Sequence, residues 1–340
     1  MRLQTRFRHI GIKILWFGVP PCPAEDTGPL EADPCRPNEV RVRGASFCPD
    51  RLRRTIAVMK FTKMHGLGND YVYVNGLEER VRDPAALARE MSDRHTGVGS
   101  DGLILILPSQ HADVRMEMYN ADGSRAQMCG NGIRCVAKYA VERKLAAGPE
   151  LRIETDAGIK LAFCEMDQDR VGLVRVDMGS PSLRAVDLPA RVESESIVDA
   201  ELVIDGTPQV MTCVSIGNPH AVLFVDAFNS IQLREVGSAI ECAPQFPERI
   251  NVHFVRVDSR SHVTMKTWER GSGATRACGT GACAACVAAS TTGRTERRIT
   301  ATLPGGSLQI DWAQSGMVYM TGPAVEVFTG EWTEHVRKHA

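Results

Sequence analysis

The chain has 340 residues, of which 43% are hydrophobic and 24% are charged, and its formal net charge is −1. This length predicts about two domains, and the composition is that of a globular protein without the roughly 18 consecutive apolar residues that crossing a bilayer requires. The balanced charge gives no general reason to bind nucleic acid or an anionic membrane, so we expect neither of them as a partner. We expect a small molecule as the substrate.

Residues 1–58 differ from the rest of the chain, because seven prolines interrupt every periodic segment in them. We expect this extension to be disordered and without function. Its basic beginning faintly resembles a transit peptide, which would direct the protein to the plastid stroma; otherwise we expect a cytoplasmic protein. Three of its cysteines stand 13 residues apart, a spacing that matches no metal-ligand pattern: Cys22, Cys35 and Cys48.

The eleven cysteines are an odd number and too few for a disulfide scaffold. A free cysteine in a reducing compartment usually behaves as a small buried apolar residue. Cys283 and Cys286 form a CxxC pair, but no second pair stands at zinc spacing, so we expect no metal. We expect six cysteines to be buried packing residues: Cys135, Cys164, Cys213, Cys242, Cys283 and Cys286.

The first elements after Met59 alternate between strand and helix patterns. A glycine-rich turn precedes a short strand at 71–74, and 84–91 has a helical pattern. An apolar run at 103–107 and a period-two run at 114–119 predict two more strands. Apolar residues recur at helical spacing from 133 to 145 and end before Gly148. The pattern therefore predicts a fold of mixed α and β elements.

The chain repeats itself when it is shifted by 149 residues, the separation of Cys129 and Cys278. The segment MEMYNADGSRAQMCGNG then lies over MKTWERGSGATRACGTG, each an alternating strand, a polar loop and a CGxG motif that opens a helix. One offset without gaps over more than sixty residues predicts two copies of one unit that face each other.

Each CGxG motif places its cysteine before a helix, where free backbone N–H groups and the helix dipole favour an anion. We therefore expect a depressed thiol pKa at Cys129 and Cys278. The glycines allow a carboxylate to approach the same N–H groups closely. Two such sites across a pseudo-twofold axis would set one sulfur on either face of an α-carbon, which is the geometry of racemisation by two acid/base groups.

A set of motifs in this order resembles the diaminopimelate epimerase family: HGLGNDY at 65–71, YNADGS at 119–124, MCGNGIRC at 128–135, IGNPH at 216–220, WERGSGAT at 268–275 and ACGTGACA at 277–284. The resemblance covers residues 59–330. It implies interconversion of LL- and meso-diaminopimelate in lysine and peptidoglycan precursor synthesis, without cofactor or metal. It also implies an α+β fold of two pseudo-symmetric domains, each a curved, mostly antiparallel sheet around a central helix.

The implied domains are 59–175 and 176–323, with 324–340 returning to the first. The resemblance makes Cys129 and Cys278 the catalytic pair, and His220 and Glu269 would tune the thiols or hold the reacting ammonium. Arg270 would pair with the distant carboxylate of the substrate. The expected substrate-binding residues are Asn69, Asn120, Gly130, Asn131, Asn218, Asn251, Glu269, Arg270, Gly279 and Thr280. The oligomeric state stays open, with a homodimer as one option.

Several alternatives compete with this interpretation. A proline or hydroxyproline racemase resembles it but normally carries His where Asn131 stands, and an isomerase without thiol bases is disfavoured by the two cysteines. A non-catalytic protein that sequesters an amino acid is a third alternative. GVGSDG at 97–102 fits a dinucleotide-binding pattern but follows a polar stretch rather than a strand. The family often has Gln where this chain has Gly102, and the effect of this difference does not follow from the sequence.

A chain shortened to begin at Met59 is expected to fold and to react at the rate of the full chain. The extension holds ten Lys and Arg against six Asp and Glu and little periodic apolar surface, so its loss should remove little buried area. Thermal unfolding and kcat/KM of both chains test this. Aggregation of the shortened chain, or loss of most of its rate with its thiols reduced, would place the boundary elsewhere.

Overall fold

The computed structural model describes residues 58–229 and 231–333. The predicted disorder of the extension, its three cysteines and the predicted return of residues 334–340 lie outside the described residues. Within the described residues, none of the helices combines the length and the apolar character needed to span a membrane. Strands dominate and a few helices pack on them, which confirms the α+β class predicted from the sequence.

The first half of the described chain contains the three strands predicted at 71–74, 103–107 and 114–119, the two helices predicted at 84–91 and 133–145, and further strands that were not predicted. In chain order they are β1 (Val58–Gly66), β2 (Asn69–Asn75), α1 (Pro84–Ser92), β3 (Gly102–Leu107), β4 (Val114–Asn120), β5 (Arg125–Ala126), α2 (Gly130–Glu142), β6 (Glu150–Thr155), β7 (Gly158–Asp167) and β8 (Arg170–Gly179). A short 3₁₀ turn, η1 (Ala185–Asp187), follows.

The second half repeats this order and adds one strand at each end. Its elements are β9 (Ala200–Ile204), β10 (Thr207–Ser215), β11 (Pro219–Phe224), α3 (Leu233–Glu241), β12 (Asn251–Ser259), β13 (His262–Glu269), β14 (Gly273–Thr275), α4 (Gly279–Thr291), β15 (Arg298–Leu303), β16 (Gly306–Trp312), β17 (Val318–Pro323) and β18 (Val325–Thr333).

The repeat found in the sequence is present in the structure and extends beyond the motifs. A shift of 149 residues carries β1 onto β10, α1 onto α3 and α2 onto α4 with identical bounds. The pairings repeat as well: β2 runs parallel to β3 as β11 does to β12, and β4 runs parallel to β6 as β13 does to β15. Each half is therefore one copy of the same unit.

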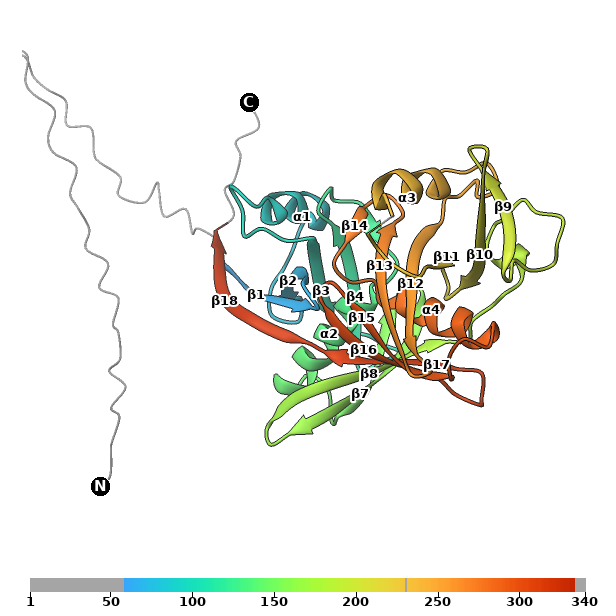
Figure 1. Cartoon of the computed structure of the whole chain (residues 1–340). Coiled ribbons are helices and arrows are strands. Elements are labelled where there is room, and N and C mark those ends of the chain that lie inside the picture. The colour runs from blue at the N-terminus through green and yellow to red at the C-terminus, as the bar shows by residue number, and fades with distance from the viewer. Residues whose placement is uncertain (1–57, 230, 334–340) are drawn as a thin grey trace, which may run out of the picture. The chain divides into compact units, whose positions relative to one another are not determined.

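Two strand pairings connect the halves. β8 of the first half pairs antiparallel with β17 of the second. β18, the last strand of the chain, pairs antiparallel with β1, from Val58 opposite Thr333 to His65 opposite Val325. Figure 1 shows this red strand beside the blue one. The end of the described chain thus completes the sheet of the first half, while the domain boundary at residue 175 stays a prediction.

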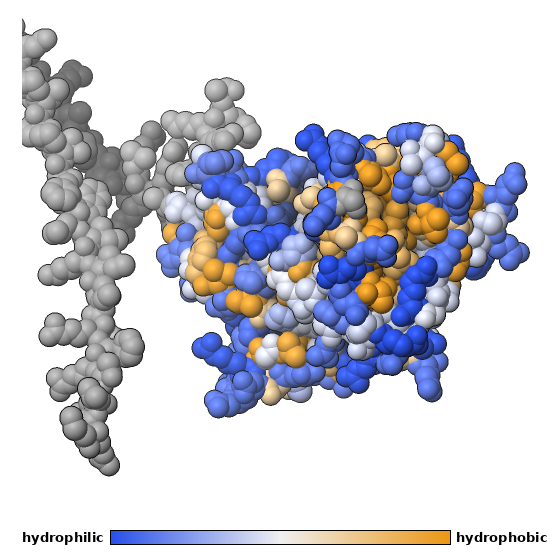
Figure 2. Space-filling view, viewed as in Figure 1, coloured by the Kyte–Doolittle hydropathy of each residue, from blue (hydrophilic) through white to orange (hydrophobic). Residues whose placement is uncertain are grey.

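The central helices α2 and α4 carry the core. Most of their residues are buried, and one apolar cluster surrounds both of them. α4 is rich in alanine, so it presents apolar side chains on every side and can be enclosed by strands. Two further clusters lie under α1 and α3. In Figure 2, apolar residues gather in the area where α3 and strands β11 to β13 lie.

The free cysteines follow the predicted packing role with one exception. Cys135, Cys164, Cys213, Cys283 and Cys286 are buried, as predicted. Cys242 is exposed, so its predicted burial is wrong. It follows the last residue of α3 as the C-terminal cap, its backbone N–H donates to the carbonyl of Ser238, and the helix buries Gly237, Ile240 and Glu241 instead.

Candidate active site

The two repeat cysteines are the N-terminal caps of the two central helices. Cys129 precedes α2 with φ −132° and ψ 122°, and Cys278 precedes α4 with φ −125° and ψ 106°. The extended cap backbone leaves the first N–H groups of each helix without helical acceptors. The Gly132 N–H donates to Cys129 Sγ over 3.4 Å. The CGxG motif thus forms a helix start, as predicted.

The two helix starts meet at one place. A Cβ atom built on Gly130 would lie 3.6 Å from the Cα of Gly279, and the reverse distance is also 3.6 Å. Met320 of β17 packs beneath both glycines. Both positive helix ends therefore converge, and only residues without a side chain allow the backbones to approach this closely.

Amide side chains surround Cys129. Its Sγ donates to Asn69 Oδ1 over 3.3 Å, and the same oxygen accepts from Asn131 Nδ2 over 3.3 Å. Asn69 Nδ2 donates to Asp101 Oδ2 over 2.7 Å. Asn131 also donates to the carbonyl of Ala277, the residue before Cys278, over 3.1 Å. Asn131 thereby ties the Cys129 helix to the loop that carries the other cysteine.

Polar groups of a different kind surround Cys278. Its Sγ lies 3.6 Å from Thr280 Oγ1. Glu269 forms a hydrogen bond with Thr275 Oγ1, and its carboxylate lies close enough to Cys278 to raise the pKa of that thiol. Burial in turn raises the pKa of the Glu269 carboxyl. The structure therefore brings Cys278, Glu269 and Thr280 together.

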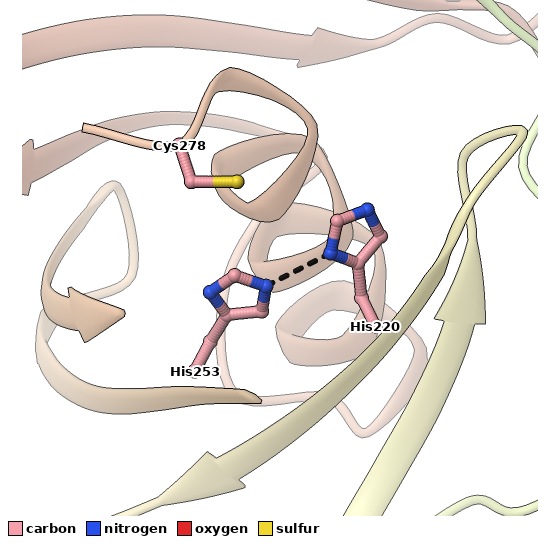
Figure 3. Close-up of side chains that lie close together, drawn as sticks. All are labelled: His220, His253 and Cys278. Atoms are coloured by element: carbon pink, nitrogen blue, oxygen red, sulfur yellow. Dashed lines mark hydrogen bonds between the residues drawn. The ribbon is translucent and has the colours of Figure 1, made fainter. Parts of the chain in front are cut away.

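His220 reaches the same thiol from β11, as Figure 3 shows. The ligand atoms of His220, His253 and Cys278 all lie within 4.8 Å of one another, and all three residues are buried. His220 Nε2 bonds to Asn218 Oδ1 over 2.8 Å, so two residues of the IGNPH motif act together. His253 was not among the predicted site residues. The repeat offers one sign of its role in the sequence: the residue 149 positions earlier is the apolar Ile104, so a polar side chain replaces an apolar one at the same place in the second half.

Burial decides the pKa of both thiols. Removal of water raises the pKa of Cys129 above its ordinary value, although the N–H groups of Gly132 and Asn131 lower it. Burial raises the pKa of Cys278 well above its ordinary value, and Glu269 raises it further. The prediction of depressed thiol pKa values is therefore wrong: the helix N–H groups act in the predicted direction, but the desolvation of the thiolate outweighs them.

The remaining predicted residues form hydrogen bonds within the protein. Asn120 Nδ2 donates to Ser124 Oγ over 3.0 Å. Asn251 uses both ends of its amide within the protein, because Nδ2 donates to the carbonyl of Pro219 over 2.9 Å and Oδ1 accepts from the Arg270 N–H over 3.0 Å. Arg270 is exposed, and its Nη1 donates to the carbonyl of Glu248 over 3.0 Å. Asn251 therefore holds the loop that presents the guanidinium.

Gly102 lies where a side chain finds no room. A Cβ atom there would lie 2.1 Å from the carbonyl oxygen of Tyr119 and 2.9 Å from Cε1 of Tyr71. A larger side chain at this position would therefore require a backbone arrangement different from the one in this chain.

The substitution Gly102→Ala is expected to lower the free energy of unfolding by about 1–3 kcal/mol, because a methyl group would force β4 away from β3. Denaturant unfolding measures this. Gly172→Ala in β8 is the matched control, since its nearest neighbour would be the Glu165 carbonyl at 3.7 Å. Equal stability of both variants would show that β3 and β4 can separate without cost.

Known proteins resemble this chain over most of its length. The family model described as Diaminopimelate epimerase matches residues 61–184 and 212–327. A diaminopimelate epimerase of Acetivibrio thermocellus is 50% identical over 274 residues, 80% of this chain and 98% of the relative. One of Methanococcus maripaludis is 48% identical over 274 residues, 80% and 99% of the two chains.

Solved structures share the fold at low sequence identity. A phenazine biosynthesis protein of the PhzF family from Bacillus anthracis has a TM-score of 0.60 at 15% identity, over 82% of this chain and 100% of that one. A hydroxyproline epimerase from Agrobacterium vitis, with bound trans-4-hydroxy-L-proline, has a TM-score of 0.58 at 17% identity, over 81% and 92%. This likeness concerns the fold alone.

Proposed function

Because this chain belongs to the diaminopimelate epimerase family, we propose that it interconverts LL- and meso-diaminopimelate by moving a proton between Cys129 and Cys278. The enzyme is an isomerase, and this reaction would supply lysine and peptidoglycan precursors. The observation that carries the mechanism is the meeting of the two helix starts, with Gly130 and Gly279 in contact and one thiol at the cap of each helix.

The reaction needs one base and one acid on opposite faces of the α-carbon. One cysteine, as thiolate, takes the α-proton: the Cα–H bond breaks and an S–H bond forms. The other cysteine, as thiol, delivers its proton to the opposite face: its S–H bond breaks and a new Cα–H bond forms. Configuration inverts, and the negative charge ends on the second sulfur. No cofactor enters this balance.

The intermediate carries negative charge on its carboxylate, which the converging helix starts would stabilise. The backbone N–H groups of both helix starts, that of Asn131 among them, with the Thr280 hydroxyl beside them, supply hydrogen-bond donors in a buried site. Glu269 lies next to Cys278 and would hold the reacting ammonium group, while His220 beside the same thiol would tune it. At the rim, Arg270 would bind the second carboxylate of diaminopimelate, which proline lacks.

Turnover in deuterium oxide tests this proposal against its alternatives. The purified chain with LL-diaminopimelate should form the meso isomer and carry solvent deuterium at the inverted α-carbon. Proline and trans-4-hydroxyproline are the controls. Turnover of either in place of diaminopimelate would favour the racemase alternative, and binding without deuterium uptake would favour a non-catalytic binding protein.

The rate should rise with pH. Because the pKa of each free thiol lies above its ordinary value of 9.0, the thiolate fraction at lower pH grows about tenfold per pH unit. We therefore expect kcat/KM to rise by close to tenfold per unit between about pH 6.5 and 8.5, below the ordinary pKa of the thiols. A full pH profile measures this, and a flat profile would mean that the thiolate exists before substrate binds.

A further inference from the structure

We propose that His253 is a positioning residue of this active site, which fixes the tautomer and the ring orientation of His220 beside Cys278. The expected effect on the reaction rate rests on the proposed function. The arrangement of hydrogen bonds between the two histidines does not depend on it. His220 Nδ1 and His253 Nε2 lie 2.9 Å apart, and both rings are fully buried. Figure 3 shows the Cys278 side chain directed toward the two rings.

The hydrogen bonds on either side of the pair determine where each proton lies. The Oδ1 atom of Asn218 can only accept, so His220 Nε2 must carry hydrogen. A neutral imidazole carries one ring hydrogen, and His220 Nδ1 is therefore an acceptor. His253 Nε2 must donate to it.

The chain of bonds ends on the hydroxyl of Thr267, which lies 3.1 Å from His253 Nδ1 and donates to it. His253 and Thr267 stand opposite each other on β12 and β13, so the sheet register sets this contact. All four ring nitrogens of the pair thus have a partner, and both rings carry their hydrogen on Nε2.

Both rings are neutral, as this pattern requires. Burial lowers the pKa of His220 well below its ordinary value, and the nearby His253 and Arg270 lower it further. Burial lowers the pKa of His253 to about 3. Neither ring becomes charged in the working pH range, so His253 acts through the direction of its hydrogen bond and not through a change in its charge.

The other half of the molecule shows that packing alone does not require a histidine here. The shift of 149 residues carries Ile104 onto His253 and Met118 onto Thr267, and these residues pair across β3 and β4 in the same way. Ile104 lies against Gly132 in the first turn of α2, as His253 lies against Gly281 in the first turn of α4. An apolar side chain fills this place in the first half.

The polar character of His253 therefore has to be explained by its partners. If His253 donated no hydrogen, His220 Nδ1 would be a buried acceptor without a partner. The ring could relieve this by moving its hydrogen to Nδ1 or by turning, and its donation to Asn218 Oδ1 would end. Asn218, which His220 holds by a hydrogen bond, and the nearby Cys278 would then lose their fixed arrangement toward the substrate.

The test compares two variants of His253. His253→Leu removes the donor, whereas His253→Gln keeps an amide N–H at a similar reach from His220. We expect His253→Leu to lower kcat about tenfold or more with little change in KM, and His253→Gln to recover most of this loss. Ile104→Val is the matched control for a disturbed helix contact, and we expect it to leave kcat within about twofold.

A direct readout separates positioning from general damage. Nitrogen-15 NMR of histidine-labelled protein reports which ring nitrogen carries hydrogen. We expect the Nε2–H tautomer for both histidines in the wild type, and a changed tautomer or exchange broadening for His220 in His253→Leu. Thr267→Val, which keeps its shape but loses the hydroxyl, should disturb the His253 signals and lower kcat by a smaller factor.

Several results would overturn the proposal. An unchanged His220 signal and full kcat in His253→Leu would do so, and so would equal losses in the Leu and Gln variants. Should both fail to fold, an unchanged spectrum and rate in Thr267→Val would count against it. If the wild type does not epimerise diaminopimelate, the proposed function fails, but the tautomer assignment is still decided by the spectra.

Discussion

Replacing either Cys129 or Cys278 by alanine should lower epimerisation to below about a hundredth of the wild-type rate. Each thiol serves one face of the substrate carbon, and a missing acid or base group typically costs 10²-fold to 10⁴-fold. The helix starts offer no second thiol, because the other cysteines of α2 and α4 lie inside the buried core. Formation of the meso isomer measures the loss.

Serine variants and a third cysteine complete this experiment. Cys129→Ser and Cys278→Ser should keep some exchange of the α-proton without inversion, because one thiol remains in place. Cys213→Ala is the control, since Cys213 is a buried cysteine in the outer core of the second half. More than about a hundredth of the activity in either alanine variant would remove that residue from the catalytic pair.

Replacing Arg270 by methionine should reduce kcat/KM for diaminopimelate by about 100-fold or more. Hydrogen bonds to charged groups contribute about 1.5–3 kcal/mol each, and a guanidinium can form two with one carboxylate. The loop itself should survive, because it is held through the Arg270 backbone N–H and Asn251. Steady-state kinetics with both isomers measures the effect.

An analogue of diaminopimelate without the distant carboxylate gives the sharper comparison. The wild type should strongly prefer diaminopimelate, and Arg270→Met should lose most of this preference. Arg256→Met is the matched control, since Arg256 is an arginine whose partner is Asp258 on the same strand. An unchanged preference in Arg270→Met would show that another group binds the distant carboxylate.

Much of this architecture could be predicted from the sequence because the chain contains an internal repeat, so that each half can be compared with the other. The offset between Cys129 and Cys278 also relates helices and strands whose sequences differ, so one motif pair predicted the plan of both halves. The CGxG motif predicted a helix start because a cap followed by glycine has a local physical meaning. Local rules of this kind are readable from one sequence.

Three features were not predictable in this way. The direction of the thiol pKa shifts depends on how much water the assembled site excludes. A local sequence motif does not predict this amount. The contact of His253 with His220 depends on the parallel register of β11 and β12, set by residues far apart in the chain. The exposure of Cys242 depends on which residues of α3 meet the sheet, and these are Gly237, Ile240 and Glu241 rather than the cap residue.

The pairing of β18 with β1 has a consequence for how the protein is made. β1 leaves the ribosome among the first folded residues, whereas its neighbour β18 is the last strand of the described chain. The first half therefore has an open strand edge throughout synthesis, and its sheet closes only after the second half has been completed. Contacts this distant along the chain form slowly, and an exposed edge invites pairing with other chains. Nascent chains of this protein therefore present the open edge of β1 to other chains until β18 has emerged.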